Sequence, residues 1–464
     1  MTRLLPALRL AIAPGLLLAA CSTLAAPASG DDPVQALQAA YARAVAPGSE
    51  AETYRGMIAT VFARVQRSYA TEVDLSSLSA EAIKVLEPLQ PGAAEPRAVF
   101  AKAINAALGT LDPYSRYLEP RAGSEGPGGS FGGVGLELEA GEGAVRVIAP
   151  IPGSPAAQAG VRAGDLIVRI DDQPLSGNPM ADAIARMRGA PGTPVSITVR
   201  RNGLSDEFTL ALKRETIRRQ AVVWHMEGDV LVLRLSGFSS AVTGTLRQAI
   251  EQASVAGAPR GFVLDLRGNP GGLLNEAVRT ADTFLSEGKI VSLRGRTPGN
   301  QRSWQADPEE LLAGVPMVVL LDRRSASASE LVAAALQDNH RATVMGQRSF
   351  GKGTVQTTYA LDEEKKGMLK LTSAFYLGPA GRSVQKVGVF PDIELLAAPA
   401  SSSEAPPERE APVPPGIPMA RVEQAQCSAV VKAADAALAC AVDFLRAGGV
   451  DAFTAGLAPR RAAP

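Results

Sequence analysis

The sequence between residues 216 and 396 alternates apolar strand-like runs with helical runs, and this alternation narrows the choice of fold more than any other feature. VLVLRLSGF (230–238) precedes TGTLRQAIEQA (243–253), GFVLDLRG (261–268) precedes GGLLNEAVRTADTFL (271–285), and PMVVLLDR (316–323) precedes ASELVAAALQD (328–338). Strands that are apolar along their whole length are typical of a sheet with helices on both faces. We therefore predict an α/β core over 216–396 with some parallel pairing.

The regions on either side of this core have different patterns. ETYRGMIATVFARVQRSYA (52–70) repeats apolar residues at helical spacing, so 34–121 is predicted to be an N-terminal helical region. After the glycine-rich joint at 123–129, residues 131–213 contain short strands, a short and a longer helix, and a hairpin at Asn202-Gly203, which indicates a compact mixed domain. Residues 397–418 are rich in proline, serine and alanine and are typical of a linker; 419–464 is predicted to be a C-terminal helical segment.

Composition excludes one class of function. Acidic and basic residues number 47 each, so the formal net charge is zero, and no basic stripe marks a nucleic-acid surface. We expect no nucleic-acid partner, and no motif calls for a metal or cofactor.

The N-terminus has the features of an export signal. Residues 1–20 combine an early arginine with an apolar run that is too short and too interrupted to span a membrane, and small residues directly precede Cys21. This arrangement resembles the lipobox of bacterial lipoproteins, in which the cysteine is acylated; the alternative is an ordinary cleavable signal with an incidental cysteine. We expect a lipid anchor at Cys21, a tether over 21–33 and a periplasmic location. Because Ser22 is not an aspartate, the outer membrane is favoured.

The remaining cysteines, Cys427 and Cys440, have no pairing that the sequence alone decides. On one straight helix they would be about 20 Å apart, which is too far for a disulfide. A bridge therefore requires the chain to turn back, near Ala434-Asp435, and the question stays open at this point.

A candidate nucleophile lies where a predicted strand meets a predicted helix. In SASAS (325–329), a serine at the helix N-terminus would have unpaired backbone N–H groups beside it that could stabilise an oxyanion. The alternative is structural, because Ser327 and Glu330 also match the S-x-x-E capping box.

The base for such a serine is not an obvious histidine. His340 is thirteen residues beyond Ser327 at the far end of the same helix, and His225 has no acidic partner in a triad pattern. A Ser-Lys pair needs no histidine, and Lys352 lies between two glycines; to act as a base its pKa must fall from about 10.4 towards 7 or 8. The alternative for an isolated GKG is a solvated turn.

A phosphate-binding loop is a further alternative for the segment around Lys352. GQRSFGKG (346–353) nearly fits the P-loop pattern, but Gly353 replaces the metal-binding hydroxyl and a strand-like segment follows where a helix is required. We therefore reject this interpretation.

Five blocks together resemble the carboxyl-terminal processing (tail-specific) serine proteases: LDPYSRYL (111–118), GFVLDLRGNPGGLLNEA (261–277), SASASE (325–330), LQDN (336–339) and FGKGTVQ (350–356). The resemblance implies a multidomain α/β fold: N-terminal helices, a PDZ domain, a ClpP/crotonase-like protease core and C-terminal helices. It also implies site roles, with Ser327 and Lys352 as the catalytic dyad, Gln356 orienting the lysine, Asp338 in a supporting position, and Ala328 with Gly271 or Gly272 forming the oxyanion hole. Arg324 departs from the family, which commonly has glycine there.

The domain at 131–213 resembles a PDZ module, chiefly through PGSPAAQAGVRAGDLIVRIDD (152–172). PDZ domains bind a chain end as an added strand and hold its carboxylate with loop amides. The resemblance assigns peptide binding to Phe131, Gly132, Gly133, Val134 and Gly135, whereas the structural alternative is a turn before a strand.

We therefore expect an exported serine endopeptidase that recognises substrate C-termini through its PDZ domain. Family analogy adds an adaptor lipoprotein as a candidate partner and homo-oligomerisation through the helical ends. The alternative from a different functional class is a catalytically inactive PDZ scaffold or adaptor of the cell envelope.

Overall fold

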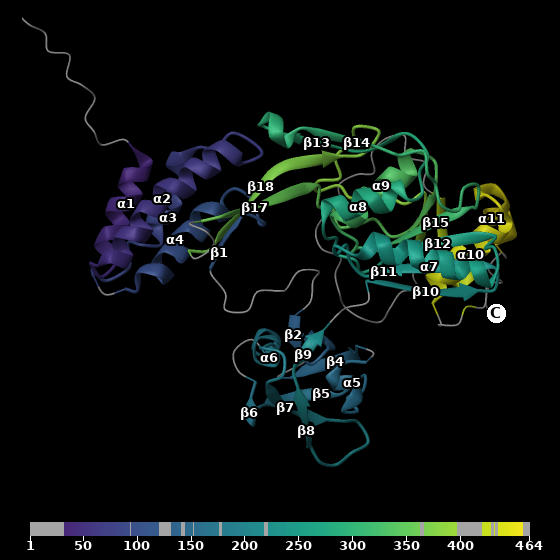
Figure 1. Cartoon of the computed structure of the whole chain (residues 1–464), viewed down its shortest axis with the longest axis horizontal. Helices are drawn as coiled ribbons and strands as arrows, with labels where there is room; N and C mark the ends of the chain where they lie inside the picture. Colours follow the sequence, from purple (N-terminus) through teal and green to yellow (C-terminus); the bar gives the residue numbers. More distant parts are fainter. Residues whose placement is uncertain are drawn as a thin grey trace, which may run out of the picture.

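The computed structural model describes residues 32–92, 94–119, 131–140, 144–151, 153–175, 179–217, 221–361, 366–396, 420–427, 431 and 435–457 (Figure 1). The predicted signal peptide, Cys21, most of the tether, the glycine-rich joint and the whole of the 397–418 linker lie outside these residues. Within the described residues, no helix has both the length and the apolarity needed to span a bilayer.

The N-terminal region is a four-helix assembly. It comprises α1 (Pro33–Ala44), α2 (Ser49–Ser68), α3 (Leu75–Lys84) and α4 (Pro96–Gly109). The predicted apolar face of α2 is buried, and Phe62 on α2 and Phe100 on α4 are among the largest fully buried side chains. The region does not end as a helix, because Asp112-Pro113 stops α4 and Arg116–Leu118 forms strand β1.

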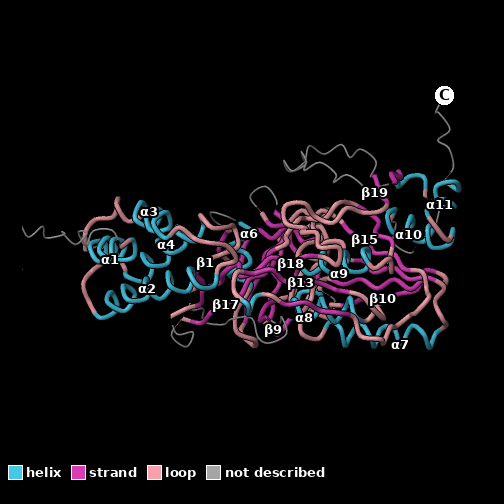
Figure 2. The backbone as a smooth tube through the Cα atoms, turned by 90° about the horizontal axis from the view of Figure 1, so that it is seen from above, coloured by secondary structure: helices cyan, strands magenta, loops and turns pink. Residues whose placement is uncertain are grey.

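Strand β1 connects the N-terminal helices to a five-stranded sheet. It pairs antiparallel with β18 (Met368–Leu377), and β18 also pairs with β17 (Thr354–Ala360) and β13 (Lys289–Gly295); β14 (Arg302–Gln305) completes the sheet beyond the 3₁₀ turn η1 (Pro298–Asn300). Leu369 and Leu371 of β18 are buried in the same cluster as the helices. Figures 1 and 2 show the long β17–β18 pair reaching from the N-terminal helices to the α/β core.

The residues at 131–213 form a separate compact domain with its own apolar cluster. A sheet in the order β3-β4-β5-β7-β8 is accompanied by two helices, and β2 pairs with β9 where the domain begins and ends. The elements are β2 (Phe131–Gly133), β3 (Leu136–Ala140), β4 (Val145–Pro150), α5 (Pro155–Gln158), β5 (Leu166–Ile170), β6 (Gln173–Pro174), α6 (Pro179–Met187), β7 (Pro194–Arg200), β8 (Phe208–Lys213) and β9 (Glu215–Ile217).

A seven-stranded sheet forms the α/β core. Its order is β10 (Val222–Glu227), β11 (Val230–Leu235), β12 (Gly261–Asp265), β15 (Met317–Leu321), β16 (Thr343–Gly346), β19 (Ile393–Leu396) and β20 (Ala420–Glu423). All neighbouring pairs from β11 to β20 are parallel, which confirms the predicted α/β core, while β10 is an antiparallel edge strand.

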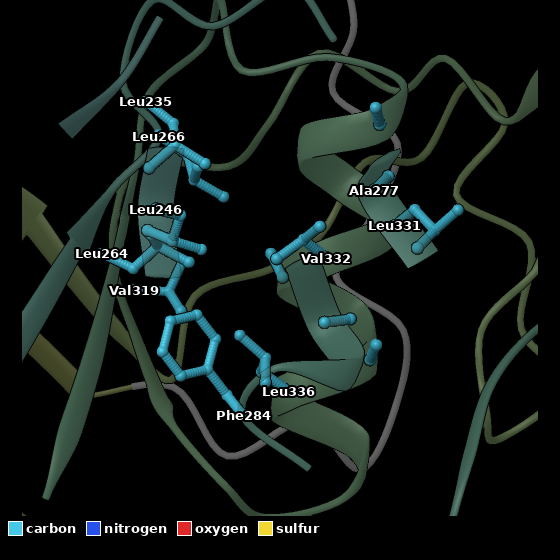
Figure 3. Close-up of a cluster of buried hydrophobic side chains, with 14 of the residues drawn as sticks. Leu235, Leu246, Leu264, Leu266, Ala277, Phe284, Val319, Leu331, Val332 and Leu336 are labelled. Carbon is cyan, nitrogen blue, oxygen red and sulfur yellow. The ribbon is translucent and has the colours of Figure 1, made fainter. Parts of the chain in front are cut away.

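Helices α7 (Val242–Ala256), α8 (Leu274–Asp282) and α9 (Ala328–Asp338) share an apolar cluster with this sheet. Figure 3 shows sheet residues such as Leu264 and Val319 facing Val332 and Leu336 of α9. Every residue from Ala328 to Leu336 is buried, so α9 is held along almost its whole length. This packing fixes the N-terminal end of α9, where SASAS lies.

The C-terminal segment is not wholly helical, so that prediction was wrong in part. Ala420–Glu423 adds strand β20 to the sheet beside β19, and only afterwards come the 3₁₀ turn η2 (Gln424–Gln426), α10 (Ala436–Ala447) and α11 (Val450–Gly456). Val422 is 1% exposed between partly exposed neighbours, the alternation of a strand with one face on the core. Four residues are too few for this period to stand out in the sequence.

Cys427 and Cys440 form a disulfide. Helix α10 starts only at Ala436, with Asp435 as its N-cap, so the two cysteines do not share one straight helix. Their Cα atoms are 5.0 Å apart, within the range that a disulfide spans. The bridge therefore connects the segment after β20 to α10, which packs on β12 and β15.

Candidate active site

Two of the three serines in SASAS have structural roles. The Ser325 hydroxyl donates to the carbonyl oxygen of Leu266 at 2.9 Å, and the Ser329 hydroxyl donates to that of Asn269 at 2.9 Å. Both side chains are fully buried, whereas Ser327 between them is partly exposed. The flanking serines thus attach the start of α9 to the loop after β12 and leave Ser327 as the accessible hydroxyl.

Ser327 has a strained backbone. Its φ of +58° lies in the region that residues with a side chain seldom adopt, at a cost of about 1–3 kcal/mol. Gly271 packs directly against it, because a Cβ on Gly271 would be 2.8 Å from Ser327 Cβ and 2.9 Å from the Ala328 nitrogen. Only glycine fits at 271, so the backbone of the loop after β12 packs directly against Ser327 at this position.

Glu330 links Ser327 to the Lys352 loop. Its Oε2 accepts from the Ser327 N–H at 2.7 Å and the Lys352 N–H at 2.8 Å, while Oε1 accepts from the Gly351 N–H and the Ser349 hydroxyl, both at 2.6 Å. The Ser327–Glu330 contact is the one that the capping box predicts, and the Glu330 N–H donates to the Ser327 carbonyl oxygen at 3.0 Å. Burial raises the pKa of Glu330, and the four donated hydrogen bonds act in the opposite direction.

Tyr376 makes a second connection between the same two segments. Its buried hydroxyl lies 2.9 Å from the carbonyl oxygen of Ser327 and 2.6 Å from that of Lys352, either of which can accept its proton. Sequence reasoning missed Tyr376 altogether and treated Glu330 only as a cap. The capping-box spacing was the one available signal for Glu330, and nothing in the local sequence marks Tyr376.

The Lys352 amine lies over an aromatic ring. Its Nζ is 4.6 Å from the centroid of Tyr114, in the LDPYSRYL block. Burial lowers the pKa of Lys352, Lys370 and then Arg116 lower it further, and Asp112 and Glu330 oppose this shift. Among the hydrogen bonds of the described residues, none joins the Lys352 amine to the Ser327 hydroxyl.

Gln356 lies four residues beyond Lys352 on β17 and contacts two threonines. Its Nε2 donates to Thr354 Oγ1 at 2.8 Å and lies 3.3 Å from Thr372 Oγ1. These contacts place its side chain between β17 and β18, and its hydrogen bonds do not include the lysine amine.

The backbone amides next to Ser327 differ in their availability. The Gly271 N–H donates to Asn269 Oδ1 at 2.9 Å, so this amide already has an acceptor. Ala328 is the first residue of α9 and has no intrahelical partner for its N–H. Neither Ala328 nor Gly272 donates among the backbone hydrogen bonds of the described loops and caps.

The alternatives to a lysine base are remote from Ser327. His225 lies on β10, three strands from β15 and therefore about 14 Å across the sheet, where its Nε2 is 3.0 Å from Glu227. His340 follows the far end of α9, about 16 Å along the helix. Asp338, also at that end, accepts from the Ala380 N–H at 3.0 Å and from Arg382, and so secures the end of α9.

The structure supports neither a phosphate-binding loop nor, within the described residues, a metal centre. The P-loop interpretation fails, because the segment after Lys352 is strand β17 and not a helix. Over the described part of the chain, no group of three or more His, Cys, Asp or Glu side chains is arranged to hold a metal ion.

A groove of about 300 Å³ lies between β3 and α6 of the 131–213 domain. Gly133, Val134 and Gly135, three of the residues predicted to bind peptide, line part of it, while Gly132 packs on the backbone of Gly189. The remaining lining is largely apolar and was not predicted from the sequence; it comprises Leu136, Glu137, Leu138, Ile148, Met180, Ile184, Met187 and Arg188. Because β3 is an edge strand, its outer side is open to an added strand.

Known proteins resemble this chain in both sequence and structure. Residues 229–395 match peptidase family S41, and residues 146–201 match the PDZ domain. A carboxy-terminal-processing protease from Bartonella bacilliformis is 38% identical over 360 residues, which are 76% of this chain and 78% of that protein. A probable CtpA-like serine protease from Staphylococcus epidermidis is 34% identical over 288 residues, covering 61% of this chain and 58% of the relative.

Among solved structures, the photosystem II D1 C-terminal processing protease has a TM-score of 0.50 at 31% identity, covering 75% of this chain and 93% of that one. A putative S41 protease from Bacteroides fragilis has the same TM-score at 15% identity, covering 72% of this chain and 89% of that one, and so supports the fold alone.

The fold and the sequence relationship define a serine peptidase of family S41, and the chain belongs to that family. Within it, the chain is a PDZ-containing carboxyl-terminal processing protease that acts on protein or peptide substrates.

Proposed function

We propose that Ser327 is the nucleophile and Lys352 the general base. The observation that carries this proposal is the double connection between their backbones, through the Glu330 carboxylate and the Tyr376 hydroxyl. Both connections are buried, so they hold two segments twenty-five residues apart in the chain at a fixed separation. Burial of Lys352 favours the neutral amine that a base requires.

In the proposed reaction, the neutral Lys352 amine accepts the proton of the Ser327 hydroxyl as the oxygen attacks the substrate carbonyl. The negative charge that develops on that carbonyl oxygen is stabilised by the N–H groups of Ala328 and Gly272. Gly272 is preferred to Gly271 for this role because the Gly271 amide already donates to Asn269. Lys352 then returns the proton to the leaving amine, and water releases the acyl group with the lysine again as base. Gln356 and Asp338 support this arrangement from β17 and from the end of α9.

The groove beside β3 is the proposed docking site for the substrate's C-terminus. A terminal segment added to the β3 edge would bring its carboxylate to the Gly133–Gly135 loop and its apolar side chains against Ile184 and Met187. The apolar lining supports a preference for apolar terminal residues. Gly132 would shape the loop rather than contact the peptide, because it is packed on Gly189; Phe131 stays a prediction.

The cellular setting is proposed from the sequence alone. Small residues before Cys21 support export and lipid anchoring, and the absence of aspartate at position 22 supports the periplasmic face of the outer membrane. An adaptor lipoprotein and self-association through the helical ends are proposed by family analogy.

The dyad is tested with an active-site probe and a peptidase assay. A fluorophosphonate should label the purified protein at Ser327, label Ser327→Ala not at all, and label Lys352→Ala slowly, while both variants keep the thermal unfolding midpoint of the wild type. Labelling of Ser327→Ala would overturn the nucleophile assignment, and full activity of Lys352→Ala would overturn the base. If the wild type is not labelled even when peptides are added, the alternative of a catalytically inactive PDZ scaffold would be favoured.

A further inference from the structure

Tyr114 reaches the proposed active site from the segment that connects the N-terminal helices to β1. The Asp112 Oδ1 accepts from the backbone N–H groups of Tyr114 at 2.7 Å and Ser115 at 2.9 Å. The Ser115 hydroxyl in turn accepts from the Thr372 N–H at 3.0 Å. Thr372 lies on β18, opposite Gln356 of β17. The loop that carries Tyr114 is therefore fixed to the strand pair next to Lys352.

The contact between Tyr114 and Lys352 is a cation–π interaction. The Nζ atom is 4.6 Å from the ring centroid, well within the range of about 6 Å over which such contacts are attractive. The ring face stabilises the ammonium form and not the neutral amine, because its attraction is to the positive charge. The contact with the ring therefore favours the protonation state that cannot act as a base, and it opposes the effect of burial on the pKa of Lys352.

The charged groups around Lys352 do not supply an alternative partner that would hold it there. Lys370 on β18 and Arg116 on β1 repel the ammonium, while Asp112 and Glu330 attract it. Glu330 already accepts four hydrogen bonds, and Asp112 accepts three from its own loop and one from the Tyr69 hydroxyl. The aromatic ring is the group that the amine directly contacts.

We propose that Tyr114 is a positioning residue that holds the Lys352 amine in a resting position away from Ser327, and that release from this ring is a step in assembling the dyad. The proposal rests on the proposed function of Lys352 as the base. It assigns a role in the catalytic cycle to a residue of the N-terminal region, which precedes the PDZ domain in the chain.

The test is the pH dependence of fluorophosphonate labelling of Ser327 in the full-length protein, with Leu, Phe and Trp at position 114. Tyr114→Leu removes the π face, so the pKa of Lys352 should fall and the acidic limb of the rate profile should move to lower pH by on the order of one unit. Below the inflection, labelling should be up to about ten-fold faster than in the wild type. Tyr114→Phe should keep the wild-type profile, and Tyr114→Trp, the strongest π donor, should move the limb to higher pH.

The matched control is Tyr359→Leu, because Arg64 lies over that ring at 4.7 Å on the same strand pair, in a contact that does not involve Lys352. It should leave the profile unchanged. A folded Tyr114→Leu with the wild-type profile, or equal shifts in Leu and Phe, would overturn the proposal. If Tyr114→Leu does not fold, the pH profiles of Tyr114→Trp and Tyr114→Phe are compared instead, and identical profiles would overturn the proposal. Failure of the proposed role of Lys352 as the base can be distinguished from this result, because Lys352→Ala would then be labelled at the wild-type rate.

Discussion

Glu330→Gln replaces a single side-chain oxygen with nitrogen, and we expect it to disrupt the hydrogen bonds that connect Ser327 to the Lys352 loop. The carboxylate accepts two hydrogen bonds on each oxygen, and a glutamine amide keeps one acceptor oxygen and replaces the other with a donor. If the amide nitrogen takes the place of Oε1, the Ser349 hydroxyl can turn and accept, but the Gly351 N–H is left buried and unpaired. If it takes the place of Oε2, the N–H groups of both Ser327 and Lys352 are left unpaired, which is worse.

The expected loss in the free energy of unfolding follows from the less costly of these two arrangements, in which only the Gly351 N–H is unpaired. One buried unpaired N–H costs about 1–3 kcal/mol, and the remaining hydrogen bonds lose about 1 kcal/mol in total strength when the acceptor is no longer charged. The free energy of unfolding should therefore fall by about 3 kcal/mol. Because the Gly351 amide loses its acceptor, the Lys352 loop should also shift, and a displacement near 1 Å lowers a rate on the order of 10²-fold.

Chemical denaturation and the fluorophosphonate labelling rate measure the two effects on one protein preparation. Glu309→Gln is the matched control, because its side chain is 78% exposed and lies 3.8 Å from Arg247; it should change stability by less than about 0.5 kcal/mol. A Glu330→Gln protein that unfolds and is labelled like the wild type would refute the view that this carboxylate holds the site together.

Three other expectations concern different parts of the molecule. Replacing both Cys427 and Cys440 with serine should lower the free energy of unfolding by about 3 kcal/mol, as for a closed loop of this length; an unchanged denaturation midpoint would contradict it. Ile184→Glu should weaken binding of a peptide with an apolar C-terminus at least ten-fold by fluorescence anisotropy, while Leu204→Glu, on the exposed β7–β8 loop, should not; equal effects would refute the groove assignment. His225→Ala should keep full peptidase activity, and a large loss would reopen the search for the base.

The core fold could be predicted because its signals are local. The apolar runs at 230–235, 261–265 and 317–321 each precede a helix, and that pattern alone specifies parallel strands with crossover helices. The short strands β1 and β20 could not be found in this way. Each has three or four residues, and each exists because a distant strand, β18 or β19, offers it a partner.

In the candidate site, too, the residues marked by local sequence could be predicted and those brought in from distant segments could not. The junction of strand and helix drew attention to Ser327, and the glycines around Lys352 drew attention to that loop. Tyr376, which joins the two segments, could not be predicted from local sequence because it lies on β18. Tyr114, which contacts the Lys352 amine, could not be placed beside it because it precedes the PDZ domain in the chain. The pairing of Cys427 with Cys440 was undecided for a similar reason, since it depends on where α10 begins.

The most direct measurement is the structure of the protein with a peptide-like inhibitor attached to the Ser327 oxygen. We predict that the Lys352 nitrogen then lies about 2.7–3.2 Å from that oxygen and has left the Tyr114 ring. An amine that remains over Tyr114, or that extends into solvent while the inhibitor occupies Ser327, would contradict it.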